Sequence, residues 1–478
     1  MPFDPISYAK TDVRILEDGY IKLFKACDPK GLKVWTYARD LVYAGKLTWD
    51  DVVKFANDVK DADILAHEFN ENMYFTDDEI ASILNSANLA VDKAVSILNN
   101  ANITADRVAS IAGSINITSS RIKEILDTGL FTDADKIAAL LDVITVDDAV
   151  TYVNSGIYSD DLLASAFNSS YLAVDKVASI ADSTNITSSR IKGLLDTGLF
   201  TDADKIAALL DGVITVDDAA THVNSGIYSD DLLASAFNSS YLAVDKGASI
   251  FNSANITTDK VATILNNANL SIDKAASILN NANLSADRVA SILNSANITV
   301  KRAASIISSG NLSGTELIDI LINSNLDKDR AASILEGSTR FVRYSFESGE
   351  NWVLDETHTD IQARITTDAN YVTHGSQAFA NGSSNYIGTG NYAYAYINTN
   401  VANVVGVFYD VTPGNNAHRQ QSEIWINDTQ VFTSTNHVRN LRFKLPSPTI
   451  VTKLEVRSHI ITYDNPGIIG IDNIRLVI

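Results

Sequence analysis

The chain has 478 residues, which exceeds one ordinary hydrophobic core and predicts several domains or an internal repeat. Its formal net charge of −21 comes almost entirely from residues 1–338, because residues 339–478 carry 10 basic against 12 acidic side chains. Such a chain repels phosphate backbones and anionic lipids, so nucleic-acid binding and adhesion to a membrane surface are not expected.

Residues 1–45 differ in composition from the rest of the chain, and we expect them to cap the adjoining region or to anchor it to a virion or cell surface. Cys27 is the only cysteine, which excludes an intramolecular disulfide and a cysteine-cluster metal site. The first twenty residues lack the basic and apolar segments of a signal peptide, and no later run approaches the roughly 20 apolar residues of a membrane span. We therefore expect cytoplasmic synthesis, no membrane insertion, and release by another route such as a virus particle.

A fourteen-residue repeat occupies residues 46–337. Its register is strict toward the end, where an asparagine followed by Ile or Leu recurs at Asn255, Asn269, Asn283, Asn297, Asn311 and Asn325. In "NLSIDKAASILNNA", Ser271 can cap a helix with one buried stripe formed by Ala275, Ile278, Leu279 and Ala282. A helix of about nine residues is shorter than the roughly 12 to 15 that are marginally stable alone, so the repeats are expected to stack as an α-solenoid.

A larger duplication lies inside this array. Residues 116–142 recur nearly unchanged at 185–211, and after the inserted Gly212 the match continues at an offset of 70 residues, or five repeats. If helices alternated between two chemically distinct layers, copying an odd number would exchange the layers. The repeats also show no alternation in composition. We therefore expect a single-helix repeat in a regular spiral rather than paired-helix repeats.

Twelve Asn-x-Ser/Thr glycosylation sequons occur, mostly at the turns of the repeat. Two repeats lose the asparagine but keep Thr132 or Ser159 as a capping residue, and the repeat of Asn325 loses the sequon but keeps Asp327 as a cap, so helix capping is the favoured cause of the pattern. Exposed turns would still be modified in a host that glycosylates. The candidate glycosylation residues are Asn102, Asn116, Asn168, Asn185, Asn238, Asn255, Asn269, Asn283, Asn297, Asn311, Asn381 and Asn427.

Enzyme motifs are missing from the sequence. It contains no zinc-protease histidine pair, nucleophile elbow, phosphate-binding glycine loop or EF-hand loop. His67, His222 and His358 have no nearby set of ligands in the sequence. The aspartates that recur in first turns are interpreted as solvated residues that match the helix dipole. Neither catalysis nor a catalytic cofactor is expected.

From residue 338 the composition changes to Tyr, Val, Thr, Asn and Gly, with period-two stretches such as "YAYAYI" and "TKLEVRSHII". This pattern predicts an all-β sandwich of eight to ten strands over residues 338–478. Three motifs, "YSFESGENW" (344–352), "VTHGSQAF" (372–379) and "IGIDNIRLVI" (469–478), occur in the order typical of one family. Residues 339–478 thereby resemble the carbohydrate-binding-module type of jelly roll, in the galactose-binding-like group.

The resemblance implies two kinds of site. A structural calcium between the first and last strands would use oxygen ligands at Glu347, Ser376 and Asp472. The alternative is a carboxylate that pairs with Arg475 or caps a turn, and it stays open. A glycan site would combine aromatic faces with amides and charges, although strand aromatics also belong to cores. The candidates for ligand binding are Tyr394, Tyr396, Trp425, Arg457, His459 and Tyr463, and Tyr409 is a further one.

The sequence thus predicts a multidomain α plus β protein, with an α-solenoid followed by a β-jelly roll. The expected function is a non-enzymatic fibre, spike or adhesin at a virion or extracellular surface. In it, a homo-oligomer or polymer projects the jelly roll toward surface glycans or a host-cell receptor. One alternative is a filament subunit whose ends join neighbouring copies. Another is a glycan-active enzyme, which needs a carboxylate pair in a cleft.

Overall fold

The computed structural model describes residues 33–58, 62–70, 75–312, 314–323, 325–344, 350, 352–356, 361–366, 378–383, 392–413, 420–434, 441–460 and 469–478. The chain divides into two compact units, residues 1–243 and 244–478, called here the N-terminal unit and the C-terminal unit. In the described residues, no helix is both long and apolar enough to cross a membrane.

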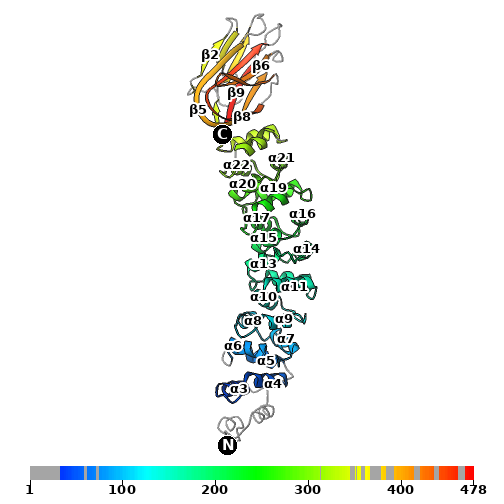
Figure 1. Cartoon of the computed structure of the whole chain (residues 1–478). Helices are drawn as coiled ribbons and strands as arrows, with labels where there is room; N and C mark the ends of the chain where they lie inside the picture. Colours follow the sequence, from blue (N-terminus) through cyan, green and yellow to red (C-terminus); the bar gives the residue numbers. More distant parts are fainter. Residues whose placement is uncertain are drawn as a thin grey trace. The chain divides into compact units, whose positions relative to one another are not determined.

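Short helices joined by tight turns make up the described part of the N-terminal unit (Figure 1). They are α3 (Lys33–Tyr43), α4 (Trp49–Asp58), α5 (Ala62–Asn70), α6 (Asp77–Asn85), α7 (Val91–Leu98), α8 (Ala105–Ala112), α9 (Ser119–Leu126), α10 (Ala134–Val143), α11 (Val146–Ser155), α12 (Asp160–Asn168), α13 (Val174–Ala181), α14 (Ser188–Asp196), α15 (Ala203–Asp211), α16 (Val216–Asn224) and α17 (Asp230–Asn238).

The C-terminal unit begins with helices of the same kind and ends with antiparallel strands. Its helices are α18 (Val244–Asn252), α19 (Thr258–Asn266), α20 (Ile272–Leu279), α21 (Ala286–Asn294), α22 (Val300–Ser308), α23 (Gly314–Ile318), the π-helix η1 (Asp319–Asn323) and α24 (Lys328–Glu336). Its strands are β1 (Phe341–Tyr344), β2 (Val353–Glu356), β3 (Ile361–Thr366), β4 (Ala378–Ser383), β5 (Tyr392–Pro413), β6 (Gln420–Ile426), β7 (Thr429–Ser434), β8 (Leu441–Ile460) and β9 (Ile469–Val477).

Side-chain caps start most helices of the array. The Ser271 hydroxyl accepts the N–H of Lys274 at 3.2 Å, and Thr299 accepts the N–H of Arg302 in the same way. Each bond satisfies one of the amides that a helix start leaves without a partner. Ala90 and Ala173 occupy the cap position of α7 and α13 and form no such bond. The expected capping rule is confirmed, but the prediction for Thr132 is wrong, because α10 begins one residue later and Asp133 caps it.

The buried stripe of the repeat differs from the prediction at one residue. In α20, Ala275, Ile278 and Leu279 are buried as expected, but Ala282 is exposed. The helix ends at Leu279, so Ala282, which lies seven residues after Ala275, falls in the following turn. Ala276 is buried in its place because a helix between two neighbours needs a wider apolar face.

Within each unit, a helix packs on the second helix along the chain, so the helices of a unit form two rows. In the C-terminal unit α18, α20 and α22 contact one another in turn, and α19 contacts α21 (Figure 1). Identical bonds recur fourteen residues apart in opposite rows: Asn266 accepts the N–H of Thr299 at 3.0 Å, and Asn252 accepts that of Ser285 at 3.4 Å. The two rows are chemically equivalent, which confirms the predicted single-helix repeat.

Arginine side chains bind carbonyls at the end of the third helix before their own and in the turn that follows it. In α21, Arg288 donates from Nε to the carbonyl oxygen of Phe251 at 3.0 Å and from Nη2 to that of Ile256 at 2.6 Å. In α22, fourteen residues later, Arg302 donates to the carbonyls of Leu265 and Leu270. We call this pair of bonds the arginine clamp; it satisfies carbonyls that the helix end leaves open.

The duplicated block keeps its contacts after an odd number of repeats. The Tyr158 hydroxyl donates to the Leu126 carbonyl at 2.8 Å, and in the second copy Tyr228 donates to the Leu195 carbonyl at 3.0 Å. The copies therefore occupy opposite rows with the same bonds, as equivalent rows require.

The strands of the C-terminal unit form one antiparallel sheet in the order β3-β4-β9-β5-β8-β6-β7, with β1 on β9 and β2 on β5. The pairing of the long strands β5 and β8 shifts register between Asn398 and Gly406, as at β-bulges, and the sheet encloses one cluster of buried hydrophobic residues, its core. Buried residues from both halves of β5, such as Ala395 and Val411, belong to this core. Nine strands in the described residues agree with the eight to ten predicted, and an α-solenoid followed by a β-sandwich is confirmed.

Candidate ligand-binding face of the sheet

Three adjacent strands, β5, β8 and β6, bring the predicted binding residues together. Tyr396 lies opposite Glu455 on β8, and Glu455 lies opposite Trp425 on β6. Alternate residues of a strand point to opposite faces, so Tyr396, Glu455 and Trp425 share one face. Their neighbours Ala395, Leu454 and Ile424 are buried in the core on the other face. We call the first face the Trp425 face.

The indole of Trp425 is held by two polar groups. The guanidinium carbon of Arg457 lies 3.5 Å from the centroid of the Trp425 ring, a cation–π stack. The indole Nε1 donates to Glu423 Oε2 at 2.8 Å, and Gln421 donates to Glu423 Oε1 at 2.7 Å. The ring orientation is therefore fixed before any ligand arrives, which lowers the entropy that binding would cost.

A second cation–π contact involves Tyr396. The ammonium of Lys453 lies 4.6 Å from the Tyr396 ring centroid and also pairs with Asp428 at 2.7 Å and with Glu455 at 3.2 Å. The hydrogen bond to Asp428, followed by that to Glu455, raises the pKa of Lys453, although burial opposes this. Glu455 is only 2 % exposed and also accepts a bond from Arg457 Nε, so its carboxylate joins the two cations.

Some of the predicted binding residues lie together on the Trp425 face and others do not. Tyr396, Trp425 and Arg457 lie together on the Trp425 face. The backbones of Tyr394 and His459 occupy positions of the same parity, opposite Arg457 and Gln421 respectively, while Tyr463 lies outside the described residues. Tyr409 is fully buried, and its hydroxyl lies 3.2 Å from that of Ser422, so this candidate belongs to the core.

Sequence reasoning missed Glu423, Glu455 and Lys453. Their signal was present, because "QSEIWI" and "KLEVRS" place polar residues at every second position beside Trp425 and Arg457. What the sequence could not supply is the pairing of β6 with β8, which brings the two rows into contact. The assignment of the Trp425 face as a binding site remains a prediction.

The expected calcium site is described only in part. Asp472 is completely buried on β9, opposite Asp410 on β5, and the amide of Asn473 donates to Asp410 at 3.1 Å. Arg475 lies 3.6 Å from Asp410, and burial lowers the pKa of this guanidinium. Glu347 and Ser376 lie outside the described residues, and the remainder of the described chain holds no cluster of three His, Cys, Asp or Glu suited to a metal. Buried oxygen donors suit calcium, while the nearby guanidinium does not, so the site stays a prediction.

The side-chain amides of several sequon asparagines donate hydrogen bonds to backbone carbonyls. The side-chain amides of Asn116, Asn297 and Asn311 donate to first-turn carbonyls two repeats earlier, at 3.2 to 3.3 Å. Asn427 adopts a positive φ of 49° in a strand turn and donates to the Ile450 carbonyl at 2.8 Å. The side chain of Asn381 lies outside the description. Glycosylation of all twelve sequons remains a prediction.

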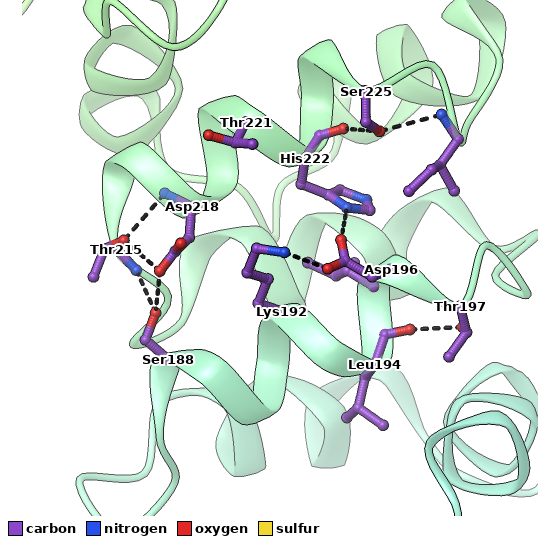
Figure 2. A network of polar contacts seen from close by, with 12 residues as sticks. Ser188, Lys192, Leu194, Asp196, Thr197, Thr215, Asp218, Thr221, His222 and Ser225 are labelled. Carbon is purple, nitrogen blue, oxygen red and sulfur yellow. Dashed lines mark hydrogen bonds and ion pairs between the residues drawn. The ribbon is translucent and has the colours of Figure 1, made fainter.

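A separate polar network lies in the N-terminal unit, on α14 and α16 (Figure 2). His222 is buried, its Nδ1 lies 3.0 Å from Asp196 Oδ1, and Lys192 also pairs with Asp196. Burial lowers the pKa of His222, and Asp196 opposes the shift. The other ring nitrogen, Nε2, is buried and makes no hydrogen bond. The buried imidazole and its carboxylate partner therefore pack as part of the core between α14 and α16.

No protein-family model matches the chain, and no curated protein matches it in sequence. Solved structures do match the β-region. A family-27 carbohydrate-binding module of Caldicellulosiruptor saccharolyticus in complex with mannohexaose covers 29% of this chain and 98% of its own, at 13% identity and a TM-score of 0.24. A family-11 module of Clostridium thermocellum with a mixed-linked tetrasaccharide covers 29% and 94%, at 11% identity and a TM-score of 0.20.

A cleaved adhesin domain of Lys-gingipain from Porphyromonas gingivalis also matches, covering 28% of this chain and 96% of its own at 12% identity and a TM-score of 0.21. The β-region is similar to these carbohydrate-binding modules at TM-scores of 0.20 to 0.24. A likeness this distant assigns neither a ligand nor an activity.

Proposed function

We propose that the Trp425 face binds a glycan and that the helical array is the spacer of an adhesin or fibre that presents it. The observation that carries the proposal is the pair of aromatic rings, Trp425 and Tyr396, on one face of three adjacent strands. Each ring is held by a cation, and carboxylates lie between them. The distant fold likeness adds no argument about the ligand.

The chemistry of this face suits a sugar. One side of a pyranose ring is lined with C–H groups, which pack against an aromatic face, while its hydroxyls need hydrogen-bond partners at the edge. Arg457 and Lys453 can donate to hydroxyl oxygens, and Glu423 and Asp428 can accept from hydroxyl protons. These four groups and Glu455 carry a net charge of −1, which favours a neutral glycan over an acidic one.

A binding role fits the carboxylates better than an enzymatic one. Glu455 is tied to Arg457 and Lys453, and Glu423 is tied to the Trp425 indole and Gln421. Neither carboxylate is set apart as a proton donor, which glycoside hydrolysis needs. Turnover of any glycan by the purified chain would favour the enzymatic alternative.

The array supports the spacer role because its length scales with the number of equivalent repeats. The placement of the protein on a virion or extracellular surface, its anchoring through residues 1–45 and its assembly into oligomers belong to the same proposal.

Binding of neutral oligosaccharides by the full chain, measured by calorimetry on a glycan panel, tests the proposal. Trp425→Ala should weaken binding of the best panel member about tenfold or more, because it removes the stacking surface. Tyr171→Ala, which removes a half-buried aromatic in the array, is the matched control and should leave the affinity unchanged. The proposal fails if no neutral glycan binds or if both variants bind equally well.

A further inference from the structure

The last helices of the array have no following repeat to pack against. A stack of repeats leaves its terminal repeat with open bonding groups, and solenoid proteins need a cap there. Within the C-terminal unit, Arg330 of α24 is the last arginine clamp of the array and bonds the carbonyls of Leu293 and Ile298. The next carbonyls in the same row, two repeats later, are those of Leu321 and Leu326.

An arginine from the β-sheet binds these two carbonyls. Arg442 on β8 donates from Nη1 to the Leu321 carbonyl and from Nη2 to the Leu326 carbonyl at 2.7 Å. Leu321 and Leu326 are five residues apart, as are the carbonyls held by Arg288, Arg302 and Arg330. Arg442 thus stands where the clamp of a further helix would stand, although it comes from a strand more than a hundred residues away.

The other row ends in a related way. Arg340, just before β1, donates from Nη2 to the Leu312 carbonyl at 3.3 Å, and Leu312 lies fourteen residues after Ile298. The N–H of Thr339 donates to the Ser308 hydroxyl at 3.1 Å. Ser308 occupies the repeat position of Asn294, which accepts the N–H of Asp327 at 2.9 Å. Both bonds continue the pattern of the array beyond its last helix.

Ion pairs surround these bonds. Lys444 on β8 pairs with Asp319 of η1 at 3.3 Å, and Glu336 at the end of α24 pairs with Arg475 at 2.8 Å and with Arg343 at 3.3 Å. Gly406 on β5 leaves room for Ile322 of η1, because a Cβ atom at Gly406 would collide with the Ile322 side chain. The sheet therefore meets the helices through close packing as well as through the two arginines.

We propose that the β-sheet is the terminal cap of the array, docked by Arg442 and Arg340 in place of the clamps of two further helices. The carbonyl groups at the end of the array bind guanidinium groups, and these guanidinium groups come from this chain's own sheet region. Helices α22 to α24 then owe part of their stability to the sheet. The inference is independent of glycan binding, since the Trp425 face takes no part in it.

Hydrogen exchange of the full chain, followed by mass spectrometry, tests the proposal. Arg442→Ala should speed exchange in residues 314–336 about tenfold or more, because buried carbonyls lose a charged donor and the local opening becomes easier. Arg330→Ala should speed exchange two repeats earlier along the chain, around residues 286–298. Arg340→Ala should affect residues 300–312.

Arg457→Ala is the matched control, because it removes the same side chain from the same strand without touching the helices. If Arg442→Ala does not fold, Arg442→Lys keeps the charge but cannot bridge two carbonyls five residues apart, and it should give a smaller increase in the same segment. Equal exchange of residues 314–336 in the wild type and in the Arg442 variants would overturn the proposal, as would an equal increase in Arg457→Ala.

Discussion

At residue 222 the two copies of the duplicated block differ in chemistry. The first copy has Tyr152, whose hydroxyl donates to the Lys123 carbonyl at 2.9 Å. The second copy has His222 in this place, with its Nδ1 against Asp196 (Figure 2). Both side chains are buried, yet only the histidine can gain a charge near neutral pH. The two copies thus differ by one titratable core group.

His222→Tyr should stabilise the protein in acid relative to the wild type. Burial lowers the pKa of His222 in the folded state, whereas the unfolded chain binds the proton at about 6.5. As the pH falls below that value, the unfolded state takes up more protons, so the free energy of unfolding of the wild type decreases. Each pKa unit of lowering corresponds to about 1.4 kcal/mol.

Thermal unfolding of both proteins between pH 7.5 and 5.5 measures this effect, and the gap between their Tm values should widen toward low pH. Tyr152→His is the reciprocal variant and should gain the same sensitivity. Parallel Tm curves would show that His222 is protonated as easily in the folded as in the unfolded state.

At the level of the helix, the sequence was a good guide to what happens within one repeat and a poor guide to what happens between repeats. Caps and the apolar stripe follow from local rules, and both are present. The first-turn aspartates were expected to be solvated, but Asp259 and Asp273 accept bonds from Ser295 and Ser309, two repeats later. A strict period cannot reveal whether a helix contacts the next helix or the one after it.

The same limit applies to the binding face. Alternation along the strand places Tyr394 and Tyr396 on one face, whereas Trp425 and Arg457 were predicted only as an aromatic and a charged group suited to a glycan. The stack of one on the other depends on the pairing of two strands separated by a turn and by β7, which no local pattern encodes.

Capping, rather than glycosylation, should govern the stability of a repeat. Thr299→Ala removes the bond to the Arg302 N–H and should cost about 1 kcal/mol in protein made without glycosylation. Ala173→Thr supplies a cap where α13 has none and should stabilise by a similar amount. Thr299→Ser keeps both cap and sequon and serves as the control. Denaturant unfolding measures all three, and equal stabilities would mean that the repeated Ser and Thr are not there for capping.

For the molecule as a whole, the equivalence of the rows and the capping sheet have different consequences. Equivalent rows mean that the number of repeats can change one at a time, which agrees with the five-repeat duplication in the sequence. The sheet, by contrast, must meet a particular end, because Arg442 and Arg340 fit carbonyls at fixed positions of the last repeats. Length is thus free to vary inside the array while its end stays defined.

Deletion of one repeat, residues 286–299, should therefore leave a folded protein. Ser285 would then cap the helix that begins at Val300, and Arg302 would reach the carbonyls of Phe251 and Ile256 that Arg288 holds in the wild type. Circular dichroism and hydrogen exchange should show unchanged helicity per residue and unchanged protection in the remaining helices. Deletion of half a repeat, residues 286–292, breaks the register and should lose this protection. If the array tolerated deletion of two repeats, residues 286–313, but not of one, the two rows would be distinct and the spiral would have a two-helix period.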